Sequence, residues 1–132
     1  MTVQTVDSIL LAEDDRIDAK AFVRTVRLLG FAAEVTVAKD GIEAWELLEG
    51  ATALQPGIIV LDINMPRMSG LELLAKIRAS ERLRKTPVFV LTTSDASGDR
   101  RAADDFDVAG YIIKSDLHGG LRCAFQRALP AA

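Results

Sequence analysis

The chain has 132 residues, 49% of them hydrophobic and 27% charged, and its formal net charge is −3. A chain of this length and composition is typical of one globular domain, so we expect a single domain over residues 1–132. The acidic balance disfavours a protein that binds nucleic acid, because such a protein needs a basic stripe for the phosphate backbone.

The sequence also disfavours export and membrane insertion. No apolar run approaches the roughly 20 residues of a membrane-spanning helix, and the polar N-terminal residues lack the basic start of a signal peptide. The single cysteine, Cys123, excludes an internal disulfide, fits a reducing compartment and is expected to fill an apolar helix face. We therefore expect a cytoplasmic protein with neither a membrane nor a nucleic-acid partner.

The first half of the chain alternates short apolar runs with amphipathic stretches. Residues 8–12 predict a buried strand, and residues 16–29 predict a helix, because apolar side chains recur there at spacings of three and four. Gly30 follows, where a helix-ending glycine is expected. A weaker strand over 33–37 and a short helix over 41–48 complete a second β–α unit.

The second half continues the same alternation. The apolar run 58–61 predicts a third strand, and residues 62–70 are expected to form a loop because they contain Pro66 and Gly70. The remaining predicted elements are helix 71–79, strand 88–91, a polar helix over 98–107, strand 111–113 and helix 117–129. Apolar strands separated by helices predict a parallel sheet covered on both faces, hence a doubly wound α/β sandwich.

Polar side chains gather where these strands end. Glu13, Asp14 and Asp15 follow the first strand, and Asp62 and Asn64 follow the third. Thr92 and Thr93 follow the fourth strand, and Lys114 and Ser115 follow the fifth. Ligands of an open parallel sheet bind beyond the carboxyl ends of its strands, so we expect these side chains at one edge. The second strand contributes nothing obvious there and is expected at the side of the sheet.

The chemistry of this set favours a metal-assisted phosphoryl transfer. Converging carboxylates repel one another, and a hard divalent cation such as Mg²⁺ relieves the repulsion while keeping several of its waters. Zinc is disfavoured because no histidine or cysteine is near in sequence. A carboxylate beside such a metal can attack phosphorus and form an aspartyl phosphate, while the metal and a lysine neutralise the phosphoryl oxygens.

Each residue alone has an ordinary explanation. Asp14 or Asp15 could simply cap the following helix, a lone Thr92 is usually a satisfied hydroxyl at a strand end, and a lone Lys114 is usually solvated. The joint occurrence of acids, a hydroxyl and a lysine, each at the end of a different strand, makes coincidence a poor explanation.

Four stretches carry a resemblance to a known family: LLAEDD, LDINMPRMSGLELL, PVFVLTTSD and GYIIKS. Over residues 8–129 the chain resembles the receiver domain of two-component response regulators. The second stretch is the most specific, because it has an Asp followed by x-x-Met-Pro-x-x-x-Gly. The resemblance implies a flavodoxin-like (βα)₅ fold with strand order 2-1-3-4-5, and a phospho-acceptor switch rather than an enzyme.

The resemblance also implies a role for each site residue. Asp62 would accept a phosphoryl group from a sensor histidine kinase. The implied Mg²⁺ ligands are Asp14 directly, Glu13 through water, Asp62, and the backbone carbonyl of Asn64. Lys114 would contact Asp62 or its phosphate, Thr92 would move toward the phosphoryl group, and Tyr111 would be the aromatic switch. The fourth helix, the last strand and the last helix would change on phosphorylation, and we expect any homodimer contact there.

Two positions depart from the family pattern. Thr93 stands where a smaller residue is usual, which narrows access to the phosphate. Ser115 stands where proline usually follows the lysine; because a cis peptide is costly without proline, we expect a trans bond between Lys114 and Ser115. LTTSD together with GYIIKS is similar to the stand-alone regulators of phytochrome-type histidine kinases, which implies a kinase partner of that type.

Three other interpretations fit the sequence less well. A small phosphatase of the haloacid-dehalogenase type needs a second aspartate two residues after the first, where this chain has Asn64. A degenerate receiver, acting only as a protein-binding module, is disfavoured by the complete set of acids, threonine and lysine. A dinucleotide-binding fold lacks its glycine-rich turn after the first strand.

Overall fold

The computed structural model describes residues 8–50, 55–93 and 97–128. Its strands are β1 (Ser8–Ala12), β2 (Glu34–Ala38), β3 (Ile58–Asp62), β4 (Val88–Thr92) and β5 (Gly110–Ile113). Its helices are α1 (Arg16–Leu28), α2 (Gly41–Glu49), α3 (Gly70–Ala79), α4 (Ser97–Asp104) and α5 (Leu117–Ala128), and a 3₁₀ turn (Lys114–Asp116) joins β5 to α5. Strand and helix alternate as the sequence predicted.

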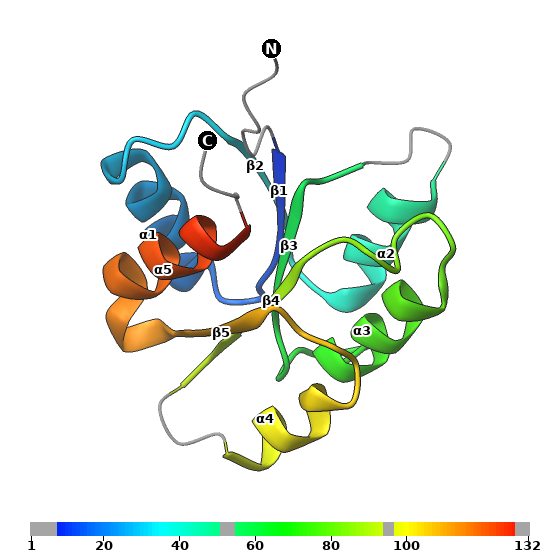
Figure 1. Ribbon diagram of the computed structural model, residues 1–132. Helices are drawn as coiled ribbons and strands as arrows, with labels where there is room; N and C mark the ends of the chain where they lie inside the picture. Colours follow the sequence, from blue (N-terminus) through cyan, green and yellow to red (C-terminus); the bar gives the residue numbers. More distant parts are fainter. Residues whose placement is uncertain (1–7, 51–54, 94–96, 129–132) are drawn as a thin grey trace.

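The strands form one parallel sheet in the order β2-β1-β3-β4-β5. Helices α1 and α5 cover one face, and α2 and α3 cover the other, with α4 beyond them near β5 (Figure 1). The predicted doubly wound (βα)₅ fold and its strand order are therefore confirmed. The second strand lies at the side of the sheet, also as expected, and β5 lies at the opposite side.

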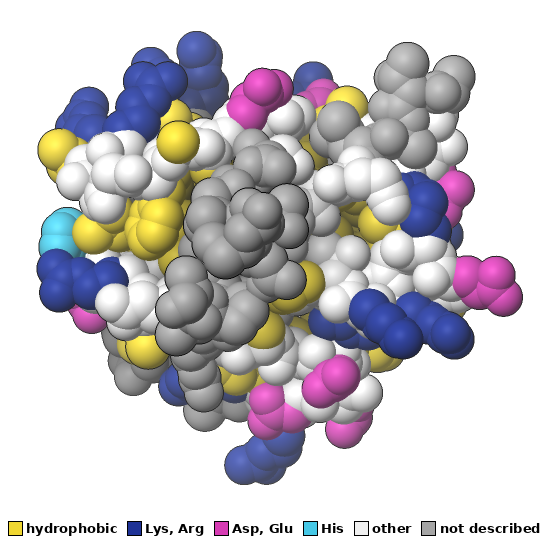
Figure 2. Space-filling model, turned by 45° about the horizontal axis from the view of Figure 1, so that its top comes forward, with side chains coloured by type: hydrophobic (Ala, Val, Ile, Leu, Met, Phe, Trp, Pro, Cys, Tyr) yellow, Lys and Arg dark blue, Asp and Glu magenta, His cyan; other side chains and the backbone are white. Residues whose placement is uncertain are grey.

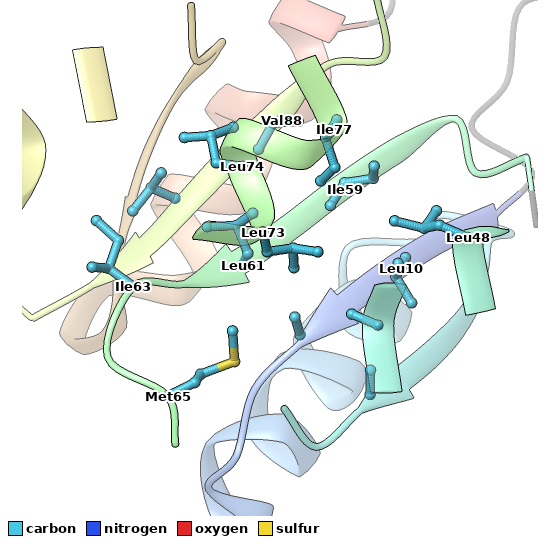
Figure 3. Packing of buried hydrophobic residues seen from close by; sticks show 14 of the residues in the cluster. Leu10, Leu48, Ile59, Leu61, Ile63, Met65, Leu73, Leu74, Ile77 and Val88 are labelled. Atoms are coloured by element: carbon cyan, nitrogen blue, oxygen red, sulfur yellow. The ribbon is translucent and has the colours of Figure 1, made fainter. Parts of the chain in front are cut away.

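Alternate residues of each strand supply two separate cores. In β1, Ile9 and Leu11 pack toward α1 and α5, whereas Leu10 and Ala12 pack toward α2 and α3. This is the two-residue period of a strand buried on both faces. Figure 3 shows the second core, in which Leu10 and other strand residues meet side chains of α2 and α3.

Local hydrogen bonds fix where the helices begin. The side chain of Asp15 caps α1 by accepting hydrogen bonds from the backbone N–H groups of Ile17 (2.8 Å) and Asp18 (3.0 Å). Ser69 and Glu72 cap α3 reciprocally, each side chain accepting from the other's backbone N–H. Helix α3 therefore begins at Gly70, one residue earlier than the apolar spacing indicated.

Three details of the sequence prediction were wrong. The fourth helix ends at Asp104 rather than at 107, because Asp107 adopts a left-handed conformation with φ 56° in the turn that follows. The second strand is shifted by one residue, to Glu34–Ala38. Cys123 is exposed on α5 and does not fill an apolar face. The prediction that α5 reaches Leu129 lies outside the described residues.

No helix in the described part of the chain is both long enough and apolar enough to cross a membrane.

Candidate functional site

Three carboxylates meet at the carboxyl ends of β1 and β3, which are neighbours in the sheet. Glu13, Asp14 and Asp62 each offer an oxygen, and these oxygens lie within 4.8 Å of one another. Glu13 is 2% exposed and Asp62 7% exposed, whereas Asp14 faces solvent. The three acids therefore converge as the sequence predicted. The carboxylate of Asp14 is the one that solvent can reach.

Lys114 reaches this cluster from the 3₁₀ turn after β5. Its Nζ lies 2.8 Å from Oδ2 of Asp62 and 3.0 Å from Oε1 of Glu13. It also lies 3.0 Å from Oδ2 of Asp18 in the first turn of α1, a partner that the sequence prediction missed. One ammonium group is thus shared by three carboxylates, from the loop after β1, from α1 and from the end of β3.

Burial and charge act in opposite directions at this cluster. Burial raises the pKa of Glu13 to about 7, although the N–H of Asp15 and the nearby Lys114 partly oppose the shift. Burial lowers the pKa of Lys114, but its hydrogen bonds to Asp62 and Asp18 and its ion pair with Glu13 outweigh burial and raise that pKa above its ordinary value. The lysine is firmly charged, and one positive charge does not balance the acids around it.

The donor set suits a hard cation. Oε1 of Glu13 is buried and has no hydrogen-bond partner, because its contact with Lys114 is an ion pair without hydrogen-bond geometry. A buried carboxylate oxygen without a hydrogen bond is costly. Oxygen ligands from Glu13, Asp14 and Asp62, with the rest of the shell left to water, match the preference of Mg²⁺.

The loop after β3 is held close beneath Asp62. The N–H of Asn64 donates to Oδ1 of Asp62 at 3.0 Å, and the N–H of Gly70 donates to the carbonyl of Ile63 at 2.9 Å. A Cβ on Gly70 would lie 2.2 Å from the backbone oxygen of Asp62, so only glycine fits there. The Asp-x-x-Met-Pro-x-x-x-Gly spacing therefore has a steric reason at its last position.

An ion pair fastens the same loop to α2. Arg67, at a left-handed φ of 70°, places Nη1 3.2 Å from Oδ2 of Asp40, the buried residue that caps α2. The sequence analysis assigned no role to either residue. A buried aspartate just before a helix, facing an arginine in a neighbouring loop, leaves no periodic signal in the sequence.

Thr92 lies at the end of β4, next to the strand that carries Asp62. It is 5% exposed, and its hydroxyl donates to the carbonyl of Thr93 at 3.1 Å. Thr93 itself faces solvent. Thr92 therefore lies near the acids, and its hydroxyl would have to turn to reach a phosphoryl group.

The Lys114–Ser115 peptide is trans, as predicted from the missing proline.

Tyr111 lies outside the acid cluster, on the side of β5 that faces α4. Its hydroxyl is within hydrogen-bond distance of the carbonyl of Arg100 (2.7 Å) and of Oδ1 of Asp104. The Arg100 guanidinium stacks over its ring at 4.6 Å. Burial, together with the Asp104 carboxylate, raises the pKa of Tyr111 to about 12. The expected switch residue thus ties β5 to α4.

Arg78 of α3 is a further connection that the sequence analysis missed. Its guanidinium donates to the carbonyl groups of Phe106 (2.7 Å), Arg84 (2.9 Å), Thr86 (2.9 Å) and Asp107 (3.0 Å). It therefore holds the loops before β4 and β5 to α3. The helical pattern has already ended where Arg78 binds, since the N–H groups of Phe106 and Asp107 donate to the carbonyls of Ala103 and Asp104, three residues back.

The fold and the site together are those of a phospho-accepting switch domain. The family model of the response regulator receiver domain matches residues 9–121, and the chain belongs to that family. Receiver domains accept a phosphoryl group on an aspartate, bind Mg²⁺ through acidic residues and receive the phosphoryl group from sensor histidine kinases.

Similar proteins share this architecture over most of the chain. The probable methanogenesis regulatory protein FilR2 of Methanothrix harundinacea is 39% identical over 109 residues, which are 80% of this chain and 70% of that protein. The response regulator Rcp1 of Synechocystis sp. is 33% identical over 111 residues, 81% of this chain and 76% of that protein.

Solved structures agree. The Mn²⁺-bound form of Rcp1 superposes with a TM-score of 0.82 at 28% identity, covering 95% of this chain and 99% of that one. The bacteriophytochrome response regulator AtBRR superposes with a TM-score of 0.83 at 28% identity, covering 98% and 97%. The similarity to regulators of phytochromes, first indicated by short motifs, thus extends to sequence and structure.

Proposed function

We propose that Asp62 accepts a phosphoryl group in a Mg²⁺-dependent reaction, and that the chain acts as a phosphorylation-controlled switch rather than as an enzyme. The observation that carries the proposal is the contact of 2.8 Å between Lys114 Nζ and Asp62 Oδ2 inside a cluster of carboxylates. A carboxylate that is paired with a lysine and lies beside a cation site is placed to attack phosphorus and to have the added charge neutralised.

The transfer exchanges one bond for another. A carboxylate oxygen of Asp62 forms a bond to phosphorus while the P–N bond of a kinase phosphohistidine breaks, and the imidazole leaves with the electron pair. Asp14, Asp62 and the carbonyl of Asn64 would hold the Mg²⁺, with Glu13 acting through water, and the ion would supply positive charge to the phosphoryl oxygens. Lys114 supplies a second positive charge, and the Thr92 hydroxyl would donate to a phosphoryl oxygen after leaving the Thr93 carbonyl.

The test is incubation with a small phospho-donor, acetyl phosphate, followed by intact-mass measurement with and without Mg²⁺. We expect the mass to rise by one phosphoryl group only when Mg²⁺ is present, and Asp62→Asn to abolish the rise. Asp105→Asn, which removes an exposed carboxylate far along the chain, is the matched control and should label normally. Equal labelling of the Asp62 variant would show that the acceptor is wrong.

For the kinase partner we propose a phytochrome-type histidine kinase. The support is the similarity to AtBRR, described as a bacteriophytochrome response regulator, over nearly the whole length of both chains. Phosphorylated phytochrome kinase and a phosphorylated kinase of another sensor class should be mixed separately with the protein. We expect faster transfer from the phytochrome kinase, and none to Asp62→Asn. Equal rates from both kinases would contradict this partner while leaving phosphoryl acceptance intact.

For the output surface, and for any homodimer, we propose the face formed by α4, β5 and α5. Strand β5 is at the side of the sheet, and a hollow of about 240 Å³ runs between it and α5, lined by residues that include Gly120 and the exposed Cys123. Because Cys123 is the single cysteine, its rate of maleimide labelling reports on this face alone. We expect phosphorylation to slow labelling as the face becomes covered; an unchanged rate, with unchanged mass by light scattering, would contradict the dimer.

A further inference from the structure

A groove between α1 and β2 has no part in the phosphoryl-acceptor chemistry. It encloses about 490 Å³. Its lining residues are Arg16, Ala19, Lys20, Val23, Arg24, Arg27 and Val37. Its floor is apolar, since Ala19, Val23 and Val37 line it and Val37 of β2 is 39% exposed, which is unusual for a valine in a strand. The groove is therefore an apolar channel beside a strand that has a neighbour on only one side.

The rim of this groove is strongly basic in an acidic protein. Arg16, Lys20, Arg24 and Arg27 are all exposed, and together they are four of the 16 lysines and arginines of a chain whose net charge is −3. Among the described residues none of the four forms an ion pair. Figure 2 shows Lys and Arg side chains gathered on the side of the molecule where α1 lies.

The spacing of these charges is regular. Arg16, Lys20 and Arg24 are four residues apart on α1, so each lies about 6 Å further along one face of the helix. Arg27 extends the row by almost one more turn. Partner carboxylates spaced at i, i+4 and i+8 on a second helix would repeat this distance and face the row, charge to charge.

We propose that this groove docks an acidic amphipathic helix of a partner protein, with carboxylates along the row of Arg16, Lys20 and Arg24 and small apolar side chains over Val23 and Val37. Charge complementarity selects an acidic occupant, and the apolar floor selects an amphipathic one. A flat anionic membrane would not fill a concave floor, and a nucleic acid would be repelled by the net negative chain. The site goes beyond phosphoryl acceptance, because none of its residues contacts Asp62.

The probe is a synthetic helical peptide of about 15 residues with glutamates at i, i+4 and i+8 beside a stripe of leucine and alanine. A second peptide of the same composition spreads the glutamates around the helix. Binding of fluorescently labelled peptide is followed by anisotropy at low and at high salt. A double-stranded DNA of similar length and vesicles of anionic lipid are titrated as competing ligands.

We expect saturable one-to-one binding of the first peptide and at least about tenfold weaker binding of the second, because only the first repeats the basic row. Lys20→Glu with Arg24→Glu should abolish binding. The matched control, Lys85→Glu with Arg122→Glu, changes the net charge equally at exposed positions elsewhere and should bind normally. Val37→Ser should weaken binding while leaving the basic row intact.

Equal binding of both peptides, or equal loss in the control variant, would reduce the effect to general electrostatics and overturn the proposal. Tighter binding of DNA or of vesicles than of the first peptide would overturn it in favour of those ligands. Each outcome can be separated from the acceptor chemistry, because Asp62→Asn should bind the peptide as the unaltered chain does.

Discussion

The ammonium of Lys114 lies 2.8 Å from a carboxylate oxygen of Asp62, although the two residues are 52 positions apart in sequence. The contact spans the sheet, from the turn after β5 at one side to the end of the central strand β3. It joins the proposed acceptor to a fixed positive charge before any phosphoryl group arrives.

Lys114→Met should destabilise the metal-free protein by about 1–3 kcal/mol, because Glu13 and Asp62 would be left buried without a counter-charge. Mg²⁺ should restore much of this loss, since the cation takes over the neutralisation. The measurement is urea unfolding with and without Mg²⁺, followed by the fluorescence of the single tryptophan, Trp45. Lys85→Met, at an exposed site, is the control. A destabilisation unaffected by Mg²⁺ would argue against a cation among these carboxylates.

Asp14→Ala should abolish Mg²⁺ binding and phosphorylation together, because Asp14 is the acid of the cluster that faces solvent. Metal-free stability should rise by about 0.5–1 kcal/mol as repulsion with Glu13 and Asp62 falls. Calorimetric titration with Mg²⁺ and thermal unfolding in a chelator measure the two effects, with Asp105→Ala as the control. Normal Mg²⁺ affinity in the Asp14 variant would mean that the ligand set is wrong.

Gly70→Ala should destabilise the protein by about 2–4 kcal/mol and impair phosphorylation, because the new methyl group would displace the backbone of Asp62. Gly98→Ala is the matched control, since a Cβ there meets nothing within 4 Å. In that helical position alanine should be neutral or stabilising, by up to about 1 kcal/mol. Similar unfolding curves for the two variants would contradict the steric explanation of the loop spacing.

Tyr111 should titrate with a pKa of about 12, well above the ordinary value for a phenol. Since the folded-state pKa is raised, its contribution to stability is present below the unfolded pKa near 10 and is lost as the pH rises through 12. Tyr111 is the single tyrosine, so phenolate absorbance reports it alone. Asp104→Asn should bring the transition to lower pH, and Asp105→Asn should not. An unchanged titration in the Asp104 variant would show that this carboxylate does not raise the pKa of Tyr111.

Arg78→Met should lower the free energy of unfolding by about 2–4 kcal/mol, because four carbonyl groups lose a charged donor at once. Hydrogen exchange should rise in the loops before β4 and β5 more than in α1. Arg84→Met, which keeps the backbone carbonyl that Arg78 binds, is the control. Unchanged exchange in both loops would show that other contacts hold them.

The sequence allowed the sheet order and the acid cluster to be predicted for different reasons. Strands buried on both faces leave long apolar runs, which identify a parallel sheet, and the ends of such strands are necessarily brought together. Asp18 was missed because a carboxylate in the first turn of a helix is ordinary there, and nothing in its spacing indicates that it faces Lys114.

The contacts of Arg78 and the end of α4 were missed for another reason. Apolar periodicity reports which side chains are buried, but it does not report which backbone carbonyls a distant arginine will bind. The helix 98–107 was predicted too long because Phe106 continues the apolar spacing past Asp104. In the structure the N–H groups of Phe106 and Asp107 donate to carbonyls three residues back, and Asp107 has a left-handed φ of 56°, so the helical pattern ends before them.

Arg78 binds the loops through backbone oxygens alone, and every amino acid carries such an oxygen. The side chain at position 84, which is exposed, can therefore change without loosening this loop from α3. The backbone contacts that hold these loops to α3 do not depend on the side chains that the loops expose to solvent. Selection for a new partner can therefore act on exposed loop side chains such as that at position 84, provided that Arg78 is kept.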